Sequence, residues 1–329
     1  MMYRMIMISC YFGRLPDYFP FFLRSVSMNP TVDLLIVTDG TVKDPPPNVR
    51  VFQCTFEDAK ARIAAVVEFP ITLDKPYKLC DFRPVWPLAF RDLIEGYDFW
   101  GHCDLDMLFG DIRSFLSDEV LATHDRIYQF GHLCFYRNTD EVAQRYRLDG
   151  GADYRTVFTS PESFAFDEFA GMGNIYSKHG FPAYCSRDHA DITGRRVRFT
   201  RTDFHVPPEE LPMNNYRHQV FYWEKGNVYR AYLKDGQILQ EEFNYIHFSG
   251  RKMPNNGVKE DQQAFFITSS GFWAKTGPIT KADLLRYEPY RLLPESIRYL
   301  RCKWNDAKGM ARYYQRILKG KLADPQSRV

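Results

Sequence analysis

Short hydrophobic runs alternate with segments of helical periodicity along the first seventy residues of the chain. Residues 5–11, 33–39 and 49–54 are continuous apolar runs of strand length, a pattern typical of strands that are covered on both faces. Residues 18–26 and 56–67 place apolar and aromatic side chains at helical spacing. This alternation predicts an α/β fold whose mixed, mostly parallel, Rossmann-like sheet is flanked by helices.

The pattern continues through the middle of the chain. Residues 86–94 have helical spacing and lead into an aromatic run, residues 97–103, which indicates a buried strand ending in Asp104 and Asp106. Further strand-like segments are residues 126–137, 195–204, 220–223, 228–233 and 244–248. Residues 234–236, Lys-Asp-Gly, predict a hairpin turn between two of these strands.

The composition changes after about residue 281. Between Arg286 and Lys321, ten Lys or Arg residues stand against three Asp or Glu residues, a local charge of +7, and six Tyr or Trp residues lie among them. We therefore expect a core domain over residues 1–280 and a basic, aromatic-rich helical appendage over residues 281–329. Such a segment suits an anionic membrane surface. The alternative is a solvated helix that packs its aromatic side chains on the core domain.

Composition and charge exclude several classes of protein. A chain of 329 residues with 45% hydrophobic and 16% aromatic residues is typical of a packed globular protein. The net charge of +2 provides no overall field that attracts nucleic acid, so we expect no nucleic-acid partner. The seven cysteines include no C-x-x-C pair, and no apolar stretch is long enough to span a bilayer. We expect a cytoplasmic protein, with peripheral contact at the inner face of the membrane as a further hypothesis.

Asp104 and Asp106 are the first candidate site residues. In an extended strand residues i and i+2 point to the same side, so both carboxylates are expected to face one point. Two hard oxygen ligands can hold Mn²⁺ or Mg²⁺ and leave other positions free for phosphate oxygens. The alternative is a pair of solvated turn aspartates, because an Asp-X-Asp triplet is common by chance.

A second constellation lies in residues 245–252, where a strand delivers His247 and the turn after it supplies Gly250, Arg251 and Lys252. Imidazole can complete a metal site begun by two carboxylates. The glycine permits close approach of the backbone to a diphosphate, whose charge the two cations can neutralise as it leaves. The alternative is a structural histidine followed by a solvated turn.

In combination, several motifs resemble a family of bacterial glycosyltransferases of GT-A fold, often encoded with capsule or O-antigen assembly genes. The motifs are MIMISCYFG, YKLCDFRP, YDFWGHCDLDMLFGDI, GHLCFYRN, AFDEF and YIHFSGRKM, over about residues 3–255. The resemblance implies a GT-A-like catalytic domain that transfers a sugar from a nucleotide-diphosphate donor, with Asp104 and Asp106 at the metal. His247 and Gly250 also resemble the HxxGxxK signature of glycogenin-like retaining transferases, but Lys252 comes one residue early, so retention is not implied.

Two further groups gain a role from this resemblance. Lys78, Asp81 and Arg83 lie in a segment that resembles one which contacts the nucleotide and donor sugar; the alternative is a surface Asp-Arg pair at a helix start. Asp167 and Glu168 are catalytic candidates, because one of them could act as general base on an acceptor hydroxyl or bind sugar hydroxyls. In a strand these adjacent residues would face opposite ways, and the alternative is a charge at a helix N-terminus.

The sequence thus predicts a metal-dependent glycosyltransferase of surface polysaccharide assembly. We expect a UDP-sugar as donor and a saccharide or lipid-linked oligosaccharide as acceptor. One alternative is a sugar nucleotidyltransferase, which is disfavoured because no glycine-rich phosphate loop follows the first strand. Another is a non-catalytic sugar-binding or assembly protein. The donor sugar and base, the acceptor and linkage, the stereochemical outcome and the oligomeric state stay open.

Overall fold

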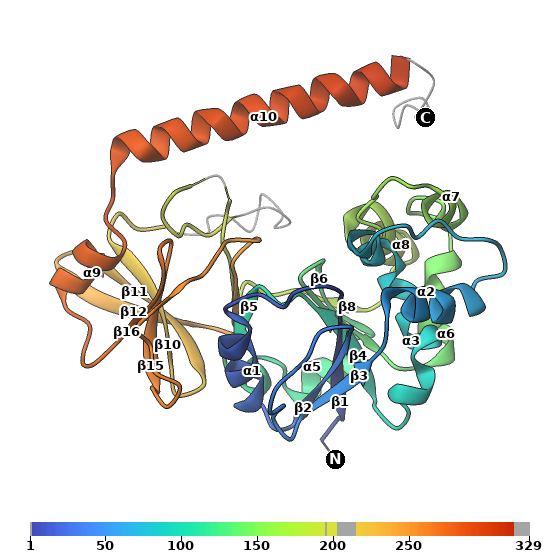
Figure 1. The fold of residues 1–329 in the computed structure, drawn as a ribbon, viewed down its shortest axis with the longest axis horizontal. Helices are drawn as coiled ribbons and strands as arrows, with labels where there is room; N and C mark the ends of the chain where they lie inside the picture. Colours follow the sequence, from blue (N-terminus) through green and yellow to red (C-terminus); the bar gives the residue numbers. More distant parts are fainter. Residues whose placement is uncertain (1, 195, 203–214, 319–329) are drawn as a thin grey trace.

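The computed structural model describes residues 2–194, 196–202 and 215–318, whose strands form three sheets (Figure 1). The largest sheet has seven strands in the order β3-β2-β1-β4-β7-β6-β8. These strands are β1 (Met5–Tyr11), β2 (Val32–Thr38), β3 (Val49–Gln53), β4 (Phe99–Cys103), β6 (Arg126–Phe130), β7 (Leu133–Arg137) and β8 (Ala183–Tyr184). Neighbouring strands are parallel except that β7 is antiparallel to both β4 and β6. The predicted mixed, mostly parallel sheet is confirmed.

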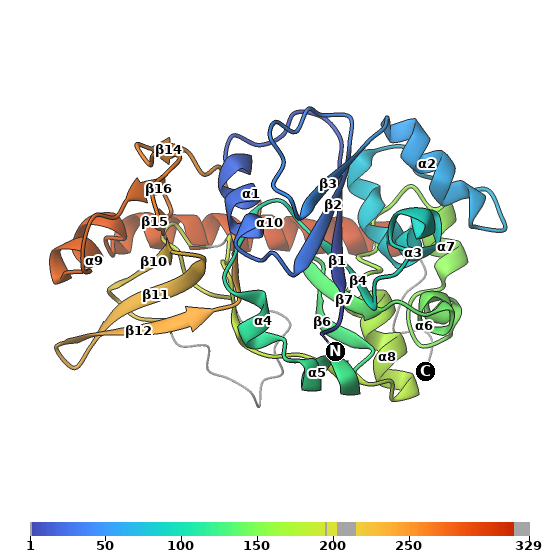
Figure 2. The same ribbon diagram turned by 90° about the horizontal axis from the view of Figure 1, so that it is seen from below.

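Helices cover both faces of this sheet (Figures 1 and 2). In β1, Met5 and Met7 pack in a cluster with α1 (Phe19–Ser27), whereas Ile6 and Ile8 pack in another cluster with α2 (Phe56–Ala65). Alternate residues of one strand therefore enter two different cores. Full burial of such a side chain contributes about 1.5–3 kcal/mol, which explains why the residues of β1 other than Ser9 are hydrophobic instead of alternating with polar residues.

The connections contain short helices. The helix expected over residues 86–94 is interrupted: α3 spans Trp86–Ala89 and a 3₁₀ turn spans Arg91–Leu93. Phe90, which follows α3, has φ −116° and ψ 24°, outside the helical region, so the regular helix ends there. The other short helices are a 3₁₀ helix (Pro76–Val85), α4 (Ile112–Phe115), α5 (Asp118–Thr123), α6 (Asp140–Gln144), a 3₁₀ turn (Arg145–Arg147), α7 (Tyr154–Thr159), a π-helix (Phe169–Gly173) and α8 (Asn174–His179).

Two of the expected strands are corrected by the structure. Residues 126–137 form the hairpin of β6 and β7, because Phe130 pairs with Leu133 and the chain reverses between them. The described residues 196–202 form no strand and make only an isolated bridge between Ile192 and Arg201; residues 195, 203 and 204 lie outside the described residues. Backbone N–H groups in this segment bond to side-chain carboxylates instead of to another strand.

A six-stranded sheet forms a second layer that the sequence pattern did not separate from the first. Its order is β12-β11-β10-β15-β16-β14. The strands are β10 (Gln219–Glu224), β11 (Asn227–Lys234), β12 (Gln237–Phe243), β14 (Asn255–Asn256), β15 (Ala264–Thr268) and β16 (Gly271–Ala274). The expected hairpin turn joins β11 and β12, and both Asp235 (φ 50°) and Gly236 (φ 80°) have the positive φ of a type I′ turn.

A small sheet of β5 (Met107–Phe109), β13 (Tyr245–His247) and β9 (His189–Asp191) joins the two layers. β13 lies between the other two strands, antiparallel to β5 and parallel to β9. Tyr245 packs in the core of the large sheet, whereas Ile246 packs in the core shared with the six-stranded sheet. The end of β13 is therefore held between both layers.

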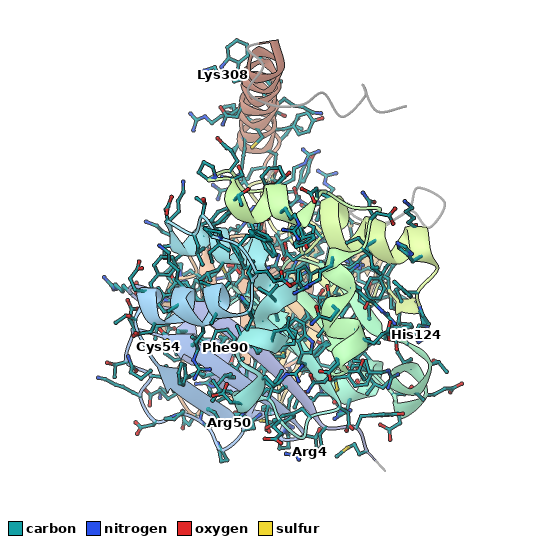
Figure 3. All side chains as sticks on the ribbon, turned by 90° about the vertical axis from the view of Figure 1, so that its right-hand side faces the viewer. Arg4, Arg50, Cys54, Phe90, His124 and Lys308 are labelled. Atoms are coloured by element: carbon teal, nitrogen blue, oxygen red, sulfur yellow. The ribbon has the colours of Figure 1, made fainter. Side chains whose placement is uncertain are left out.

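Within the described residues, the C-terminal segment contains α9 (Lys281–Tyr287) and α10 (Leu292–Leu318). Leu284 is fully buried, and Tyr287 stacks on Phe266 of β15 with ring centroids 4.4 Å apart. α10 then runs along the outside of the molecule, and Figure 3 shows Lys308 on this projecting helix. Among the described helices, none combines the length and hydrophobicity needed to cross a bilayer.

Candidate metal and sugar-nucleotide site

The small sheet brings Asp104, Asp106 and His247 together. Asp104 follows the last residue of β4, Asp106 precedes β5, and His247 ends β13, where it pairs with Met107. One ligand atom from each of the three residues lies within 4.8 Å of the others. The imidazole Nε2 is 3.3 Å from Asp106 Oδ2. Two carboxylates and an imidazole at this spacing fit a single Mn²⁺ or Mg²⁺ ion, with Mn²⁺ the better match for a nitrogen ligand.

The two aspartates converge for a reason different from the expected strand pleat. Asp104, Leu105 and Asp106 form a bend between β4 and β5. The Asp104 N–H donates to the His132 carbonyl at 3.0 Å, and the Phe248 N–H donates to the Asp106 carbonyl at 2.7 Å. Leu105, the residue between the two aspartates, is buried and anchors the bend in the core. Backbone bonds to two separate elements therefore set the direction of the carboxylates.

The charges of the three residues compensate one another. Burial of Asp106 would raise its pKa, but the neighbouring imidazolium and the Gly250 N–H, which donates to Oδ2, lower that pKa to about 2. Burial of His247 disfavours its charged form, but Asp106 and Asp191 outweigh burial and raise its pKa well above the usual value. Burial raises the pKa of Asp104 despite the attraction of Arg83. A cation that binds here must displace the Nε2 proton, so binding is coupled to proton release.

Arg83 connects this group to the first catalytic candidate. Its guanidinium donates to Asp104 Oδ1, to the carbonyl of Gly131 and, at 2.7 Å, to Asp167 Oδ2. Asp167 is 1% exposed, and burial raises its pKa to about 6. The structure thus brings together three residues that the sequence assigned to separate roles.

Glu168 lies beside the same centre but faces a different partner. A methyl group on Gly131 would lie 2.2 Å from Glu168 Oε1, so the carboxylate fits here only because residue 131 has no side chain. Burial raises the pKa of Glu168, with a further contribution from Asp104. Asp167 and Glu168 belong to the turn before the π-helix and not to a strand; the Asp167 carboxylate bonds to Arg83, whereas the Glu168 carboxylate lies against Gly131.

Lys78 and Asp81 form a buried pair away from the acidic group. Lys78 Nζ lies 2.7 Å from Asp81 Oδ2 and donates to the carbonyl of Val157 at 2.9 Å. The Asp81 carboxylate accepts the N–H groups of Phe164 and Phe166. These bonds hold the loop that leads to Asp167. Direct contact of Lys78 and Asp81 with a donor stays a prediction, since their polar atoms already bind this loop.

The three predicted residues of the turn after β13 lie in three different environments. Gly250 has φ 68° and offers its N–H to Asp106, and the space where a Cβ would stand is open. Arg251 turns away and donates to backbone carbonyls of the segment before Phe199, whose ring lies beneath its guanidinium. Lys252 is exposed and lines a cavity of about 420 Å³ together with residues 14–18, Met253 and Pro254. Lys252 is thus the cation of this turn that faces open space.

Sequence reasoning missed Asp191, which accepts the Nδ1 proton of His247 at 2.8 Å. His132 stacks on His247 with ring centroids 4.3 Å apart. The available signal in the sequence was the alternation of polar and apolar residues over His189, Ala190 and Asp191, followed by an apolar residue, which is typical of a strand. It is too short to identify a strand without its pairing partner.

Comparison with known proteins places the chain in a family. No curated protein matches its sequence. Similar solved structures include galactosyltransferase LgtC in complex with donor and acceptor sugar analogues (11% identity, TM-score 0.35, 57% of this chain and 76% of that one). Another is mouse xyloside xylosyltransferase 1 in its apo form (8% identity, TM-score 0.37, 58% of this chain and 88% of that one). A third is the glycosyltransferase GlyE of Streptococcus pneumoniae TIGR4 (8% identity, TM-score 0.35, 78% of this chain and 57% of that one).

Similarity at this level does not assign a function. One family model matches residues 7–276, most of the chain. The protein therefore belongs to DUF6625, described as a family of unknown function.

Proposed function

We propose that this protein is a metal-dependent glycosyltransferase that moves a sugar from a nucleotide-diphosphate donor, with UDP-sugars as the first candidates, to a saccharide acceptor. The observation that carries the proposal is the convergence of Asp104, Asp106 and His247, whose ligand atoms lie within 4.8 Å of one another. Their donor set suits a divalent cation that keeps open positions for phosphate oxygens. Such an ion would act as a Lewis acid on the diphosphate leaving group.

The residues around this group have complementary tasks. Arg83 holds Asp104 and Asp167 in fixed positions through its guanidinium. Lys252, at the cavity formed with residues 14–18, is a cation available to neutralise charge on the departing nucleotide. Gly250 contributes a backbone N–H that fixes Asp106.

Of the two catalytic candidates, Glu168 is the better one for contact with the acceptor. Asp167 is buried and ion-paired with Arg83. We therefore assign it a structural role in the site. Glu168 is only partly buried, and burial raises its pKa towards neutral pH, where a carboxylate is a more effective base. We assign Glu168 to acceptor hydroxyl binding or deprotonation.

The C-terminal helix supports a role for the protein at a membrane surface in polysaccharide assembly. Its apolar side chains Leu293, Ile297, Leu300 and Trp304 are exposed and spaced by three or four residues, which places them on one helix face. Lys303 and Lys308 are exposed on the same helix. An amphipathic basic helix of this kind suits the interface of anionic lipids, and a lipid-linked acceptor would be concentrated there.

The test is nucleotide release by the purified protein with Mn²⁺ and a panel of sugar nucleotides, with and without saccharide acceptors. We expect release of a nucleoside diphosphate that is lost in Asp106→Ala and retained in Asp111→Asn. The control residue lies on the same segment, but its side chain caps α4, a task that asparagine also performs. Consumption of added pyrophosphate, with conversion of a sugar nucleotide into a nucleoside triphosphate and a sugar 1-phosphate, would indicate a nucleotidyltransferase. Sugar binding without turnover of any donor would indicate a binding protein, and either result would overturn the proposal.

A further inference from the structure

We infer that Asp191 is a positioning residue that fixes the orientation and tautomer of His247, so that Nε2 faces Asp104 and Asp106. The inference rests on the proposed metal site and adds a residue that touches neither ion nor substrate. Its Oδ1 lies 2.8 Å from His247 Nδ1, on the side of the ring opposite to Nε2. Nε2 in turn lies 3.3 Å from Asp106 Oδ2.

The pairing register of the small sheet produces this contact. β9 and β13 are parallel, and His247 is the register partner of Asp191. Two residues earlier, Tyr245 is the partner of His189, and their rings stack with centroids 5.4 Å apart. Since residues i and i+2 of a strand share a face, both pairs lie on one face of this sheet. A shift of register by one residue would place Ala190 beside His247 and remove the carboxylate.

The ring of His247 is held by a second contact. His132 stacks on it with an interplanar angle of 11°. His132 Nε2 is itself 3.0 Å from the hydroxyl of Tyr245. The carboxylate therefore fixes which nitrogen points to the aspartates, and the stacked ring fixes the plane in which it does so.

His132, Asp191 and His247 are close enough to form a second metal group, but their bonds favour a supporting role. In this group the Asp191 carboxylate is already bonded to His247 Nδ1. His132 Nε2 already bonds to a tyrosine hydroxyl. The arrangement instead matches the carboxylate–histidine–metal geometry in which a carboxylate takes the distal N–H of a metal ligand.

The consequence is a loss of metal affinity when Asp191 is removed. A neutral imidazole donates from one nitrogen and accepts through the other, and only an acceptor at Nδ1 keeps the Nε2 lone pair free for a cation. Substitution of such a carboxylate typically weakens metal binding by about 10- to 100-fold. Asn at this position keeps an acceptor oxygen and should lose less than Ala.

The experiment is an electron paramagnetic resonance titration of the full chain with Mn²⁺ alone, in wild type, Asp191→Ala and Asp191→Asn. Asp188→Asn is the matched control, because Asp188 is a buried carboxylate of the same segment that bonds to Tyr128 and not to His247. We expect about 10- to 100-fold weaker binding in Asp191→Ala, a smaller loss in Asp191→Asn, and less than about 3-fold change in Asp188→Asn.

Histidine ¹⁵N NMR of the Mg²⁺-loaded protein gives an independent readout. The Nδ1–H tautomer of His247 should dominate in wild type and lose its dominance in Asp191→Asn, a variant close enough in shape to fold. If wild type binds Mn²⁺ and both Asp191 variants bind it equally well with an unchanged tautomer, the positioning role is wrong while the metal site stands. If wild type binds neither Mn²⁺ nor Mg²⁺, the proposed metal site itself fails, and the positioning role falls with it.

Discussion

Arg83 donates a hydrogen bond of 2.7 Å to Asp167, although the two residues are 84 positions apart in the chain. Both side chains are almost fully buried, so the ion pair is removed from water. Loss of one partner of such a pair leaves an uncompensated buried charge. This bond joins the 3₁₀ helix Pro76–Val85 to the loop that presents Glu168. It makes the candidate site a single unit.

Arg83→Met should destabilise the protein by about 3–5 kcal/mol, since Asp167 would lose its counter-charge in a buried position. The double variant Arg83→Met/Asp167→Asn should be more stable than Arg83→Met alone, because the buried charge at position 167 is then removed as well. Urea unfolding of the wild type, both single variants and the double variant measures the coupling energy. Additive effects of the two substitutions would show that the pair does not act as a unit.

Gly131→Ala should lower turnover at saturating donor without weakening Mn²⁺ binding. The added methyl group would stand 2.2 Å from Glu168 Oε1 and push the carboxylate out of its place. Gly277→Ala is the control, because its added methyl group meets nothing within 4 Å. The acceptor dependence of kcat and the Mn²⁺ affinity are the two measurements. Unchanged turnover in Gly131→Ala would remove Glu168 from the acceptor site.

Lys252→Ala should reduce kcat more than it weakens donor binding, because negative charge on the leaving nucleotide develops mainly in the transition state. We expect a loss of about 100- to 1,000-fold in kcat, the size that one charge-stabilising group commonly contributes. Lys259→Ala serves as the control, since Lys259 is an exposed lysine outside the cavity lining. Equal kinetics of the two variants would show that Lys252 is a solvated turn residue.

The stability of the protein should depend on pH through Glu288. Burial raises the pKa of this carboxyl to about 7, although it accepts N–H groups of Phe199 and Ser269. The folded state therefore binds more protons than the unfolded state between the ordinary pKa and about 7. The contribution of Glu288 to stability is full below the ordinary pKa and is lost as pH rises to about 7, by at most about 3 kcal/mol.

Glu288→Gln should remove this part of the pH dependence. Urea unfolding of the wild type and the variant at a series of pH values from about 4 to 8 gives the difference in slope that belongs to this residue. Parallel curves for the two proteins would mean that the carboxyl titrates normally in the folded state.

Deletion of residues 301–329 should weaken binding to anionic vesicles by at least about tenfold while transfer to a short soluble acceptor continues, because each basic residue near such a surface contributes about 1 kcal/mol. The cut lies beyond Glu288 and Glu295, whose carboxylates bind the N–H groups of Val197, Arg198 and Phe199. A cut at Lys281 would break those bonds and confound the result. Vesicle sedimentation is the measurement, and equal binding by the shortened chain would make α10 a structural helix.

Local patterns in the sequence were enough to predict the class of fold. In β1 every residue except Ser9 is hydrophobic because both faces of the sheet are covered, and this property is visible in seven consecutive residues. The Asp104–Asp106 pair and His247 could also be named as candidate ligands from residue type and their place at strand ends. These inferences depend on neighbours in the chain, which a sequence displays directly.

The tertiary structure alone decided which side chains meet. Asp191 contacts His247 through the register of β9 against β13, and Arg83 contacts Asp167 across 84 residues. No pattern in the neighbouring sequence predicts either contact. Arg251 looked like a partner of a diphosphate but bonds to backbone carbonyls of a distant segment. The physical reason is that periodicity reports burial of one segment, whereas hydrogen-bond partners depend on how segments far apart in the chain are packed.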